Sequence, residues 1–409
     1  VYKRQVLDFA KKNYKNVVYL NFFENPDYAS VFAGSLEVDT IVMMLSALLG
    51  SEAVFESGST VLILDEIQEC PEARTALKFF RIDGRYDVIG TGSLLGVKGY
   101  GKEPKSVPVG SETVIDMYPL DFEEFLWANG IADPVIDMLK KCLQKETPVP
   151  EALHNRMKQL LLQYVVVGGM PDAVQTFVDT KQMDEVLQIQ RDIVRSYEDD
   201  MVKYAEKKDK SRIKECFQSI PKQLSKENKK FQYSVVKKGS TASKYAGSLQ
   251  WIEDAGIIVR CYNLSITELP LDGNAEEDIF KVYMRDCGLF ISMLEDGTQY
   301  DILQGNLYGY KGAIFENLIA DVFGKMGRKL YYFHKDSGLE VDFVIRYKGK
   351  CTLVEVKAST GNTKSTRTIL RHPEKYHVSQ AIKLGDYNVG RTEQLLTLPL
   401  YMAFLLKEL

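Results

Sequence analysis

Two acidic residues follow a short apolar run near residue 65. The run Val61–Leu64 is apolar, and Asp65 and Glu66 come directly after it, which places two carboxylates at the carboxyl end of a predicted buried strand. Open α/β sheets bind their ligands at this edge. One carboxylate can hold a divalent cation there while the next activates a water molecule. The alternative is structural, because a buried strand can end in acidic residues that have no catalytic role.

A second group of charged residues lies near the end of the chain. Asp342 belongs to one strand-like run, Glu355 and Lys357 belong to the next, and Lys348–Lys350 forms a turn between them. In a hairpin, Asp342 and Glu355 lie on adjacent strands, and Lys357 lies on the same face as Glu355. Two acids that bind magnesium and a lysine that positions water suit phosphodiester hydrolysis. The alternative is a structural cluster of ion pairs.

A third acid joins this group from a predicted helix at residues 311–323. Glu316 stands among apolar neighbours at helical spacing. A carboxylate on so apolar a face needs a partner, and a metal ion or Lys357 would supply one. Glu316 is therefore a candidate metal ligand beside Asp342 and Glu355, and an ion pair with Lys357 is the alternative.

The middle of the chain carries a strong local excess of positive charge. Residues 203–244 hold 13 Lys or Arg against 4 Asp or Glu, a net of 13 − 4 = +9. The segment Thr241–Tyr262 has the pattern of a helix, a turn and a strand, which resembles the second half of a winged-helix module. Lys237, Lys238 and Lys244 are then candidates for contacts with nucleic-acid phosphates. The alternatives are a protein-docking module or a solvated lysine face.

The elements that must position the first pair of acids alternate along the chain. Strand-like runs at Asn16–Phe22, Val61–Ile67 and Tyr86–Gly92 are separated by segments with helical apolar spacing at Tyr28–Leu49 and Pro71–Ile82. This alternation predicts an α/β domain with a largely parallel sheet.

A series of motifs from residue 16 onward resembles a bacterial and archaeal family of AAA-type P-loop ATPases. The motifs are VVYLNF, LILDEIQ, VIGTGSLLG, YPLDFEEFL at Tyr118–Leu126 and VGGMPDAV at Val167–Val174. The resemblance covers nearly the whole chain. It implies ATP and Mg²⁺ as cofactors, with Asp65 at the magnesium ion, Glu66 as the residue that activates water, and Thr91 and Ser93 beside the γ-phosphate.

The family places a glycine-rich phosphate-binding loop before the helix that leads into VVYLNF, and here we expect that helix at Val6–Tyr14. The chain begins Val1-Tyr2-Lys3-Arg4-Gln5, and its first glycine is Gly34. That opening resembles the translation of an adapter used to prepare sequencing libraries. We therefore expect that the natural protein extends upstream of Val6, and that the chain as it stands binds ATP weakly or not at all because it lacks the loop's backbone N–H groups and lysine.

The group near the end of the chain resembles the core of the PD-(D/E)XK nucleases, whose signature is an acid followed by Glu-x-Lys on the next strand. Asp342, Glu355 and Lys357 match that signature, and Glu316 matches the glutamate that this core adds on the preceding helix. Lys357 would then be catalytic. Many members of this superfold are thought to have lost cleavage, so a degenerate binding domain is the alternative.

Composition excludes several classes of protein. Hydrophobic residues make up 45% and charged residues 26% of 409 residues, which is typical of globular chains and leaves no long disordered stretch. The longest apolar runs are shorter than the roughly 20 residues needed to cross a bilayer. Six cysteines are scattered singly, which fits neither a zinc site nor a disulfide framework. We expect a cytoplasmic protein with reduced thiols.

The sequence thus predicts an α/β protein in three parts. We expect an AAA-type ATPase core without its phosphate-binding loop at 1–130, a helical and winged-helix connector at 131–270, and a small α/β domain like a restriction endonuclease at 271–409. The favoured function is a nucleotide-driven machine acting on or near nucleic acid, with a homo-oligomer expected when intact. The alternatives are a DNA nuclease gated by ATP and a non-catalytic module that binds DNA or a protein partner.

Overall fold

The computed structural model describes residues 2–93, 110–204, 209–226, 229–306, 311–358 and 363–407. The chain divides into two compact units, Val1–Met117 and Tyr118–Leu409, and each is described by itself. The three-part division expected from the sequence stays a prediction. The α/β class is confirmed, with a parallel three-stranded sheet first, a helical middle and small sheets towards the end of the chain. Within the described residues, no helix is long and apolar enough to span a bilayer.

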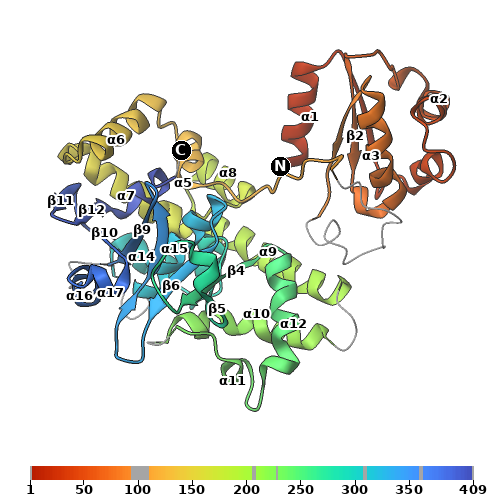
Figure 1. Cartoon of the computed structure of the whole chain (residues 1–409). Helices are drawn as coiled ribbons and strands as arrows, with labels where there is room; N and C mark the ends of the chain where they lie inside the picture. The colour runs from red at the N-terminus through yellow and green to blue at the C-terminus, as the bar shows by residue number, and fades with distance from the viewer. Residues whose placement is uncertain are drawn as a thin grey trace. The chain divides into compact units, whose positions relative to one another are not determined.

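The first unit is a three-stranded parallel sheet with helices on both faces (Figure 1). Its strands run in the order β1 (Asn16–Asn21), β2 (Thr60–Asp65), β3 (Asp87–Gly90). Its α-helices are α1 (Tyr2–Asn13), α2 (Val38–Leu49) and α3 (Pro71–Asp83), and its 3-10 helices are η1 (Pro26–Phe32), η2 (Gly50–Glu52) and η3 (Ile67–Glu69). These strands match the three runs predicted from the sequence.

Alternation along β2 explains why both faces of the sheet are covered. Val61 and Ile63 point to one face, where they pack with Ala10 of α1. Leu62 and Leu64 point to the other face, where they pack with α2, α3 and η1. All six residues of β2 are buried, as expected for a central parallel strand.

One predicted helix of this unit is interrupted. The segment Tyr28–Leu49 was expected to be helical, but η1 ends at Phe32 and α2 begins only at Val38. Gly34 and Ser35 lie between them, and such residues favour a loop over a helix interior. The helix expected at Pro71–Ile82 is present as α3.

The second unit begins with helices and then combines helices with two sheets. Its helices are α5 (Phe122–Ala128), α6 (Asp133–Lys145), α7 (Glu151–Val167), α8 (Pro171–Thr180), α9 (Met183–Tyr204), α10 (Lys210–Leu224), α11 (Tyr233–Val236), α12 (Ala242–Asp254), η4 (Leu271–Asn274), α13 (Cys287–Ser292), α14 (Thr298–Gln304), α15 (Lys311–Lys325), α16 (Lys364–Leu370), α17 (Pro373–Tyr376) and η5 (Leu400–Leu405). Its strands are β4 (Ile258–Leu264), β5 (Ala275–Met284), β6 (Leu330–His334), β7 (Glu340–Val341), β8 (Phe343–Tyr347), β9 (Lys350–Val356), β10 (Gln380–Gly385), β11 (Gly390–Thr392) and β12 (Leu395–Pro399).

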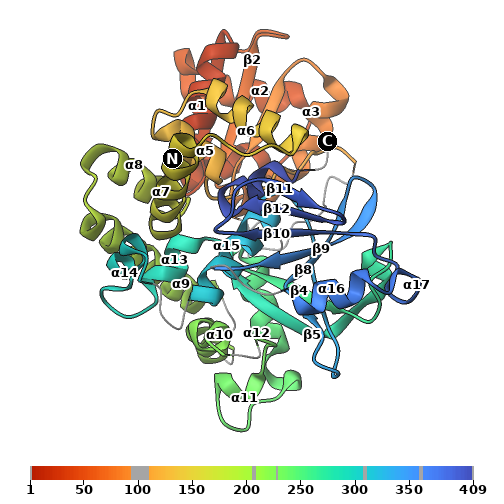
Figure 2. The same ribbon diagram turned by 90° about the vertical axis from the view of Figure 1, so that its left-hand side faces the viewer.

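The strands form a five-stranded sheet in the order β11-β12-β10-β9-β8 and a four-stranded sheet in the order β5-β4-β6-β7. Figure 2 shows the five strands of the larger sheet side by side. Strands β8 and β9 are antiparallel, with Phe343 opposite Val354, which is the hairpin expected from the turn at residues 348–350. Helix α15 is buried on all sides from Ala313 to Gly324, as an apolar helix at the centre of a unit must be.

Hydrogen bonds fix the backbone of Leu120, near the start of the second unit. The Leu120 N–H donates to the Gly169 carbonyl at 2.7 Å. The Leu120 carbonyl accepts from the Tyr164 hydroxyl at 2.8 Å and from Lys325 Nζ at 3.1 Å. Lys325 is buried and also pairs with Asp321 at 2.9 Å. A buried, charge-assisted hydrogen bond therefore fixes the backbone of Leu120.

Candidate functional site

Both oxygens of the Asp65 carboxylate accept hydrogen bonds. Asp65 is fully buried at the end of β2. Its Oδ2 accepts from the Tyr19 hydroxyl at 2.6 Å and from Asn21 Nδ2 at 3.1 Å. Its Oδ1 accepts from the Glu66 N–H at 3.0 Å and from the Thr91 hydroxyl. Burial and the bond to Asp65 raise the pKa of Tyr19 to about 12, so the tyrosine stays a donor.

The backbone turns sharply at Glu66, directly after the strand. Glu66 has φ +53°, in the left-handed region, and Gln68 Nε2 donates to Glu66 Oε2 at 2.6 Å. A Cβ on Gly92 would lie 2.3 Å from Gln68 Oε1, so the Gln68 side chain would have to move to admit one. Ser93 is exposed. The end of β3 therefore brings the Thr91 hydroxyl to the carboxylate of Asp65, and the place of Thr91 and Ser93 beside a γ-phosphate stays a prediction.

The hydrogen bonds to Asp65 limit how Mg²⁺ could bind there. Mg²⁺ typically takes one or two carboxylates and keeps several waters. Both oxygens of Asp65 already accept hydrogen bonds from Tyr19, Asn21, Glu66 and Thr91. A magnesium ion would thus bind Asp65 through a water molecule, or it would displace one of these donors. The Thr91 hydroxyl is the donor suited to be displaced. The last three residues of the motif VIGTGSLLG, which follow Ser93, lie outside the described residues.

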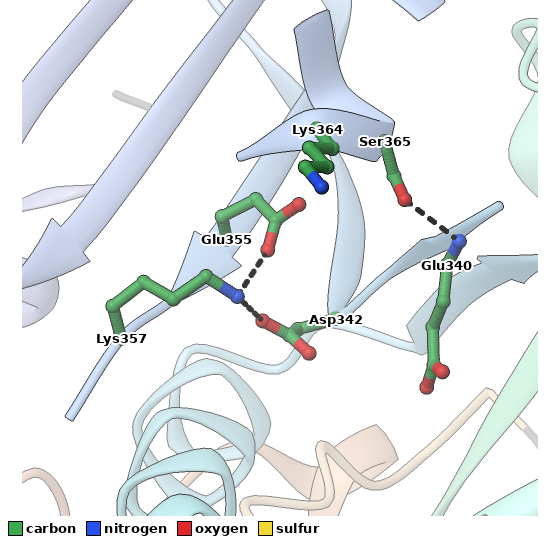
Figure 3. A pocket seen from close by; sticks show the side chains of 6 residues that line it. All are labelled: Glu340, Asp342, Glu355, Lys357, Lys364 and Ser365. Carbon is green, nitrogen blue, oxygen red and sulfur yellow. Dashed lines mark hydrogen bonds and ion pairs between the residues drawn. The ribbon is translucent and has the colours of Figure 1, made fainter. Parts of the chain in front are cut away.

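The second candidate site is built on the β8–β9 hairpin. Lys357 Nζ lies 2.7 Å from Glu355 Oε2 and 3.9 Å from Asp342 Oδ2, so the three predicted residues converge (Figure 3). Asp342 Oδ2 also accepts from the Val356 N–H at 2.8 Å. Glu355 Oε1 accepts from the Thr366 hydroxyl at 2.7 Å. The backbone of one strand and the first turn of α16 thus orient the two acids.

An open pocket of about 430 Å³ lies over this group. The residues that line it come from β7, β9, the residues that follow each of these strands, and the start of α16, and they are Glu340, Asp342, Glu355, Lys357, Lys364 and Ser365 (Figure 3). The Glu340 N–H donates to the Ser365 hydroxyl at 3.2 Å. The pocket is therefore polar and carries charges of both signs.

Burial and nearby charges shift the pKa of two groups in this pocket, Asp342 and Lys357. Burial raises the pKa of Asp342 to about 7, helped by the negative charges of Glu316 and Glu355. Burial alone would lower the pKa of Lys357, but Asp342 and Glu355 outweigh burial and raise it. A cation bound near Asp342 would favour its charged form.

Glu316 has partners that the sequence did not identify. It is buried in α15, where Lys229, Lys281 and Tyr283 all contact its carboxylate, with Lys281 Nζ 3.1 Å from Oε1. Lys357, the protein partner expected from the sequence, is not among these contacts. The two lysine charges outweigh burial and lower the pKa of Glu316.

Lys281 and Tyr283 are two of the site residues that sequence reasoning missed. They lie two positions apart on β5 and therefore share one face of the strand. Lys281 Nζ also lies 2.9 Å from Glu340 Oε1, at the pocket. A lysine within an apolar strand was the available signal, because buried lysines are paired.

Asp342 and Glu355 are the acids of the pocket that could hold a magnesium ion. Within the described ranges, no group of three or more His, Cys, Asp or Glu residues could hold a metal ion. Asp342 and Glu355 fit an ion that completes its shell with water. Because Glu316 is occupied by two ammonium groups and a hydroxyl, its role as a metal ligand stays a prediction.

The three lysines predicted to contact nucleic acid lie around α11 and α12. Lys237 pairs with Glu215 at 2.8 Å, whereas Lys238 and Lys244 are exposed. Helices α10, α11 and α12 precede the antiparallel strands β4 and β5, and the winged-helix module expected from the sequence stays a prediction. Strand β5 opens with Glu276, Glu277 and Asp278, so the hairpin is acidic. Nucleic-acid binding by these lysines stays a prediction.

Comparison with known proteins divides the chain into matched segments. Residues 5–126 match the model of an AAA domain. Residues 158–300 match a domain of unknown function, DUF8612, and residues 311–401 match another, DUF4143. No curated protein matches the chain.

A solved structure that resembles the chain is the Walker-type ATPase PABY2304 of Pyrococcus abyssi. It is 12% identical, with a TM-score of 0.36 over 68% of this chain and 84% of that protein. Residues 5–126, which contain Asp65, Glu66 and Thr91, are thus similar to the AAA domain of P-loop ATPases, and the rest of the chain is similar to domains of unknown function.

Proposed function

We propose that the first unit hydrolyses a nucleoside triphosphate, ATP in the simplest case, at Asp65, Glu66 and Thr91. The observation that carries this proposal is the fixed Asp65 carboxylate, bonded to Thr91 from the neighbouring strand, with Glu66 next to it at a turn. The match of residues 5–126 to an AAA domain supports it.

Each residue has a distinct part in this reaction. A magnesium ion at Asp65 would neutralise charge on the phosphates. Glu66 accepts the proton of the attacking water, and the Gln68 amide, 2.6 Å from Glu66 Oε2, orients that carboxylate. Thr91 holds Asp65 in place through its hydroxyl, which donates to Asp65 Oδ1.

The test compares ATP turnover by the wild-type protein with turnover by two variants. Glu66→Gln keeps the side-chain volume but removes the base, so we expect turnover to fall about 10²- to 10⁴-fold. Glu52→Gln, an exposed change in the same unit, serves as the matched control and should leave turnover unchanged. Turnover that survives Glu66→Gln would contradict the role given to Glu66.

A second candidate function belongs to the pocket of the second unit. The specific observation is the convergence of Asp342, Glu355 and Lys357 on an open polar pocket. We propose that this pocket hydrolyses phosphodiester bonds in nucleic acid, with a magnesium ion at Asp342 and Glu355. Lys357 positions the water and stabilises charge that develops on the phosphate. Water attacks phosphorus, the bond from phosphorus to one sugar oxygen breaks, and a proton from the water ends on that oxygen.

Cleavage and binding of plasmid DNA separate this function from a binding module. Magnesium-dependent cleavage that disappears in Lys357→Ala but persists in Lys350→Ala, an exposed change on the same strand, would support the nuclease. DNA that is bound but stays intact would contradict it. If that binding is lost when Lys237 and Lys238 are replaced, the second unit acts as a nucleic-acid-binding module.

A further inference from the structure

A buried lysine lies between two acids at the pocket of the second unit. Lys281 is 1% exposed. Its Nζ lies 2.9 Å from Glu340 Oε1 and 3.1 Å from Glu316 Oε1, and it stands over the Tyr332 ring at 4.7 Å. One fixed ammonium group therefore joins an acid that lines the pocket to an acid inside the unit.

The two acids have different surroundings. Glu316 is buried, with Lys229 and Tyr283 as further partners, whereas the Glu340 side chain is 43% exposed and lines the pocket. A buried carboxylate must be compensated by a positive charge. A divalent cation or a lysine ammonium can supply that charge, and here Lys281 does so.

Phosphodiester hydrolysis is commonly performed by two divalent cations a few ångströms apart. We propose that Lys281 takes the place of one of them. It is a positioning residue that holds Glu340 and Glu316, and the pocket binds a single divalent cation, at Asp342 and Glu355. This inference rests on the magnesium ligands assigned above, and it adds that Glu316 and Glu340 are partners of a lysine rather than ligands of a metal ion.

The number of bound ions tests the proposal without an activity assay. Titration of the metal-free protein with Mn²⁺, followed by calorimetry or electron paramagnetic resonance, should give one ion per chain. Lys281→Ala leaves a cavity between Glu340 and Glu316, so it should bind two ions. Lys281→Met fills the space with apolar atoms and should bind one. The double variant Lys281→Ala with Glu340→Gln should return to one ion, and Lys350→Ala, the exposed control, should stay at one.

Loss of a buried ammonium can prevent folding, so a milder variant supplies an independent reading. Glu340→Gln alone removes a charge from a half-exposed side chain that is not a ligand in this proposal. We expect the Mn²⁺ affinity to stay within about threefold, because changes at true ligands or their partners cost about 10- to 100-fold. A tenfold or greater loss of affinity would overturn the proposal.

The outcomes separate this inference from the magnesium assignment. Two ions in the wild type, or a folded Lys281→Ala variant that binds no more ions than the wild type, would overturn the role of Lys281. One ion in Lys281→Ala and none in the wild type would support the role of Lys281 and contradict the ion at Asp342 and Glu355. A wild type with one ion that is lost in Asp342→Asn would support that ion.

Discussion

Two aspartates of this chain show how surroundings decide what a carboxylate can do. Asp65 accepts hydrogen bonds from neutral donors, among them Tyr19 and Thr91, whereas Asp342 stands among other carboxylates and has its pKa raised to about 7, first by burial. Hydrogen bonds to the charged form favour ionisation, and burial beside like charges opposes it. Asp65 is therefore held in place by its hydrogen-bond donors, whereas a cation bound beside Asp342 would stabilise its charged form.

Asp65→Asn should destabilise the first unit. The amide NH₂ of the asparagine would replace one carboxylate oxygen and face the N–H and hydroxyl donors that now bond to Asp65. Buried donors would then lack an acceptor. We expect a loss of about 1–3 kcal/mol, measured by urea unfolding. Asp8→Asn, an exposed change on α1, should change stability by less than about 0.5 kcal/mol. Equal effects of the two variants would contradict this account of Asp65.

Deprotonation of the buried Asp321 carboxyl group should lower the stability of the second unit as pH rises. Burial raises its pKa to about 7 against the opposing charge of Lys325, with Asp286 raising it further and Arg285 lowering it. Between about pH 4 and 7 the folded state keeps a proton that the unfolded state has lost, so stability falls by up to about 1.4 kcal/mol per pH unit. Above pH 7 the effect is complete.

Asp321→Asn provides the matched measurement for this pH dependence. It cannot titrate, so the difference in unfolding free energy between the wild type and this variant should shift in favour of the variant from pH 5 to pH 7. Parallel stability curves for the two proteins over this range would show that Asp321 does not titrate there.

At the scale of elements, the backbone of Leu120 can pack closely against residue 169 only because Gly169 has no side chain. A Cβ on Gly169 would lie 2.0 Å from the Leu120 carbonyl oxygen, so Gly169→Ala must move the backbone. We expect a loss of at least about 2 kcal/mol. Gly247, on α12, has open space around the corresponding position, and Gly247→Ala should instead stabilise by up to about 1 kcal/mol. Urea unfolding of both variants tests the contrast, and two losses of similar size would contradict it.

The sequence predicted elements well where the signal was local. The apolar run before Asp65 became β2, and the turn at residues 348–350 became the β8–β9 hairpin. The partners of Lys281 were out of reach, since Glu316 and Glu340 lie 35 and 59 residues away in the chain. Whether a buried acid meets a lysine or a metal ion depends on tertiary packing, which a single sequence does not encode locally.

At the scale of the whole molecule, the chain contains two compact units, Val1–Met117 and Tyr118–Leu409. Each has a core of its own, so each should unfold as a separate cooperative step. We expect residues 118–409 alone to keep a sigmoidal urea transition, measured by circular dichroism. Gly169→Ala should lower the midpoint of that transition and leave the transition of the first unit in the full chain in place. A single transition that shifts as a whole would contradict separate folding.

The bond between Lys325 and the Leu120 carbonyl also has a mechanical meaning. Only Tyr118 and Pro119 lie between Met117 and Leu120, so the three Cα-to-Cα steps from Met117 to the fixed backbone of Leu120 span about 10 Å at full extension. Lys325, at the end of α15, is buried. A pull on the chain at Met117 is therefore not absorbed by a slack loop. The load passes through Leu120 to α15, the helix that also carries Glu316.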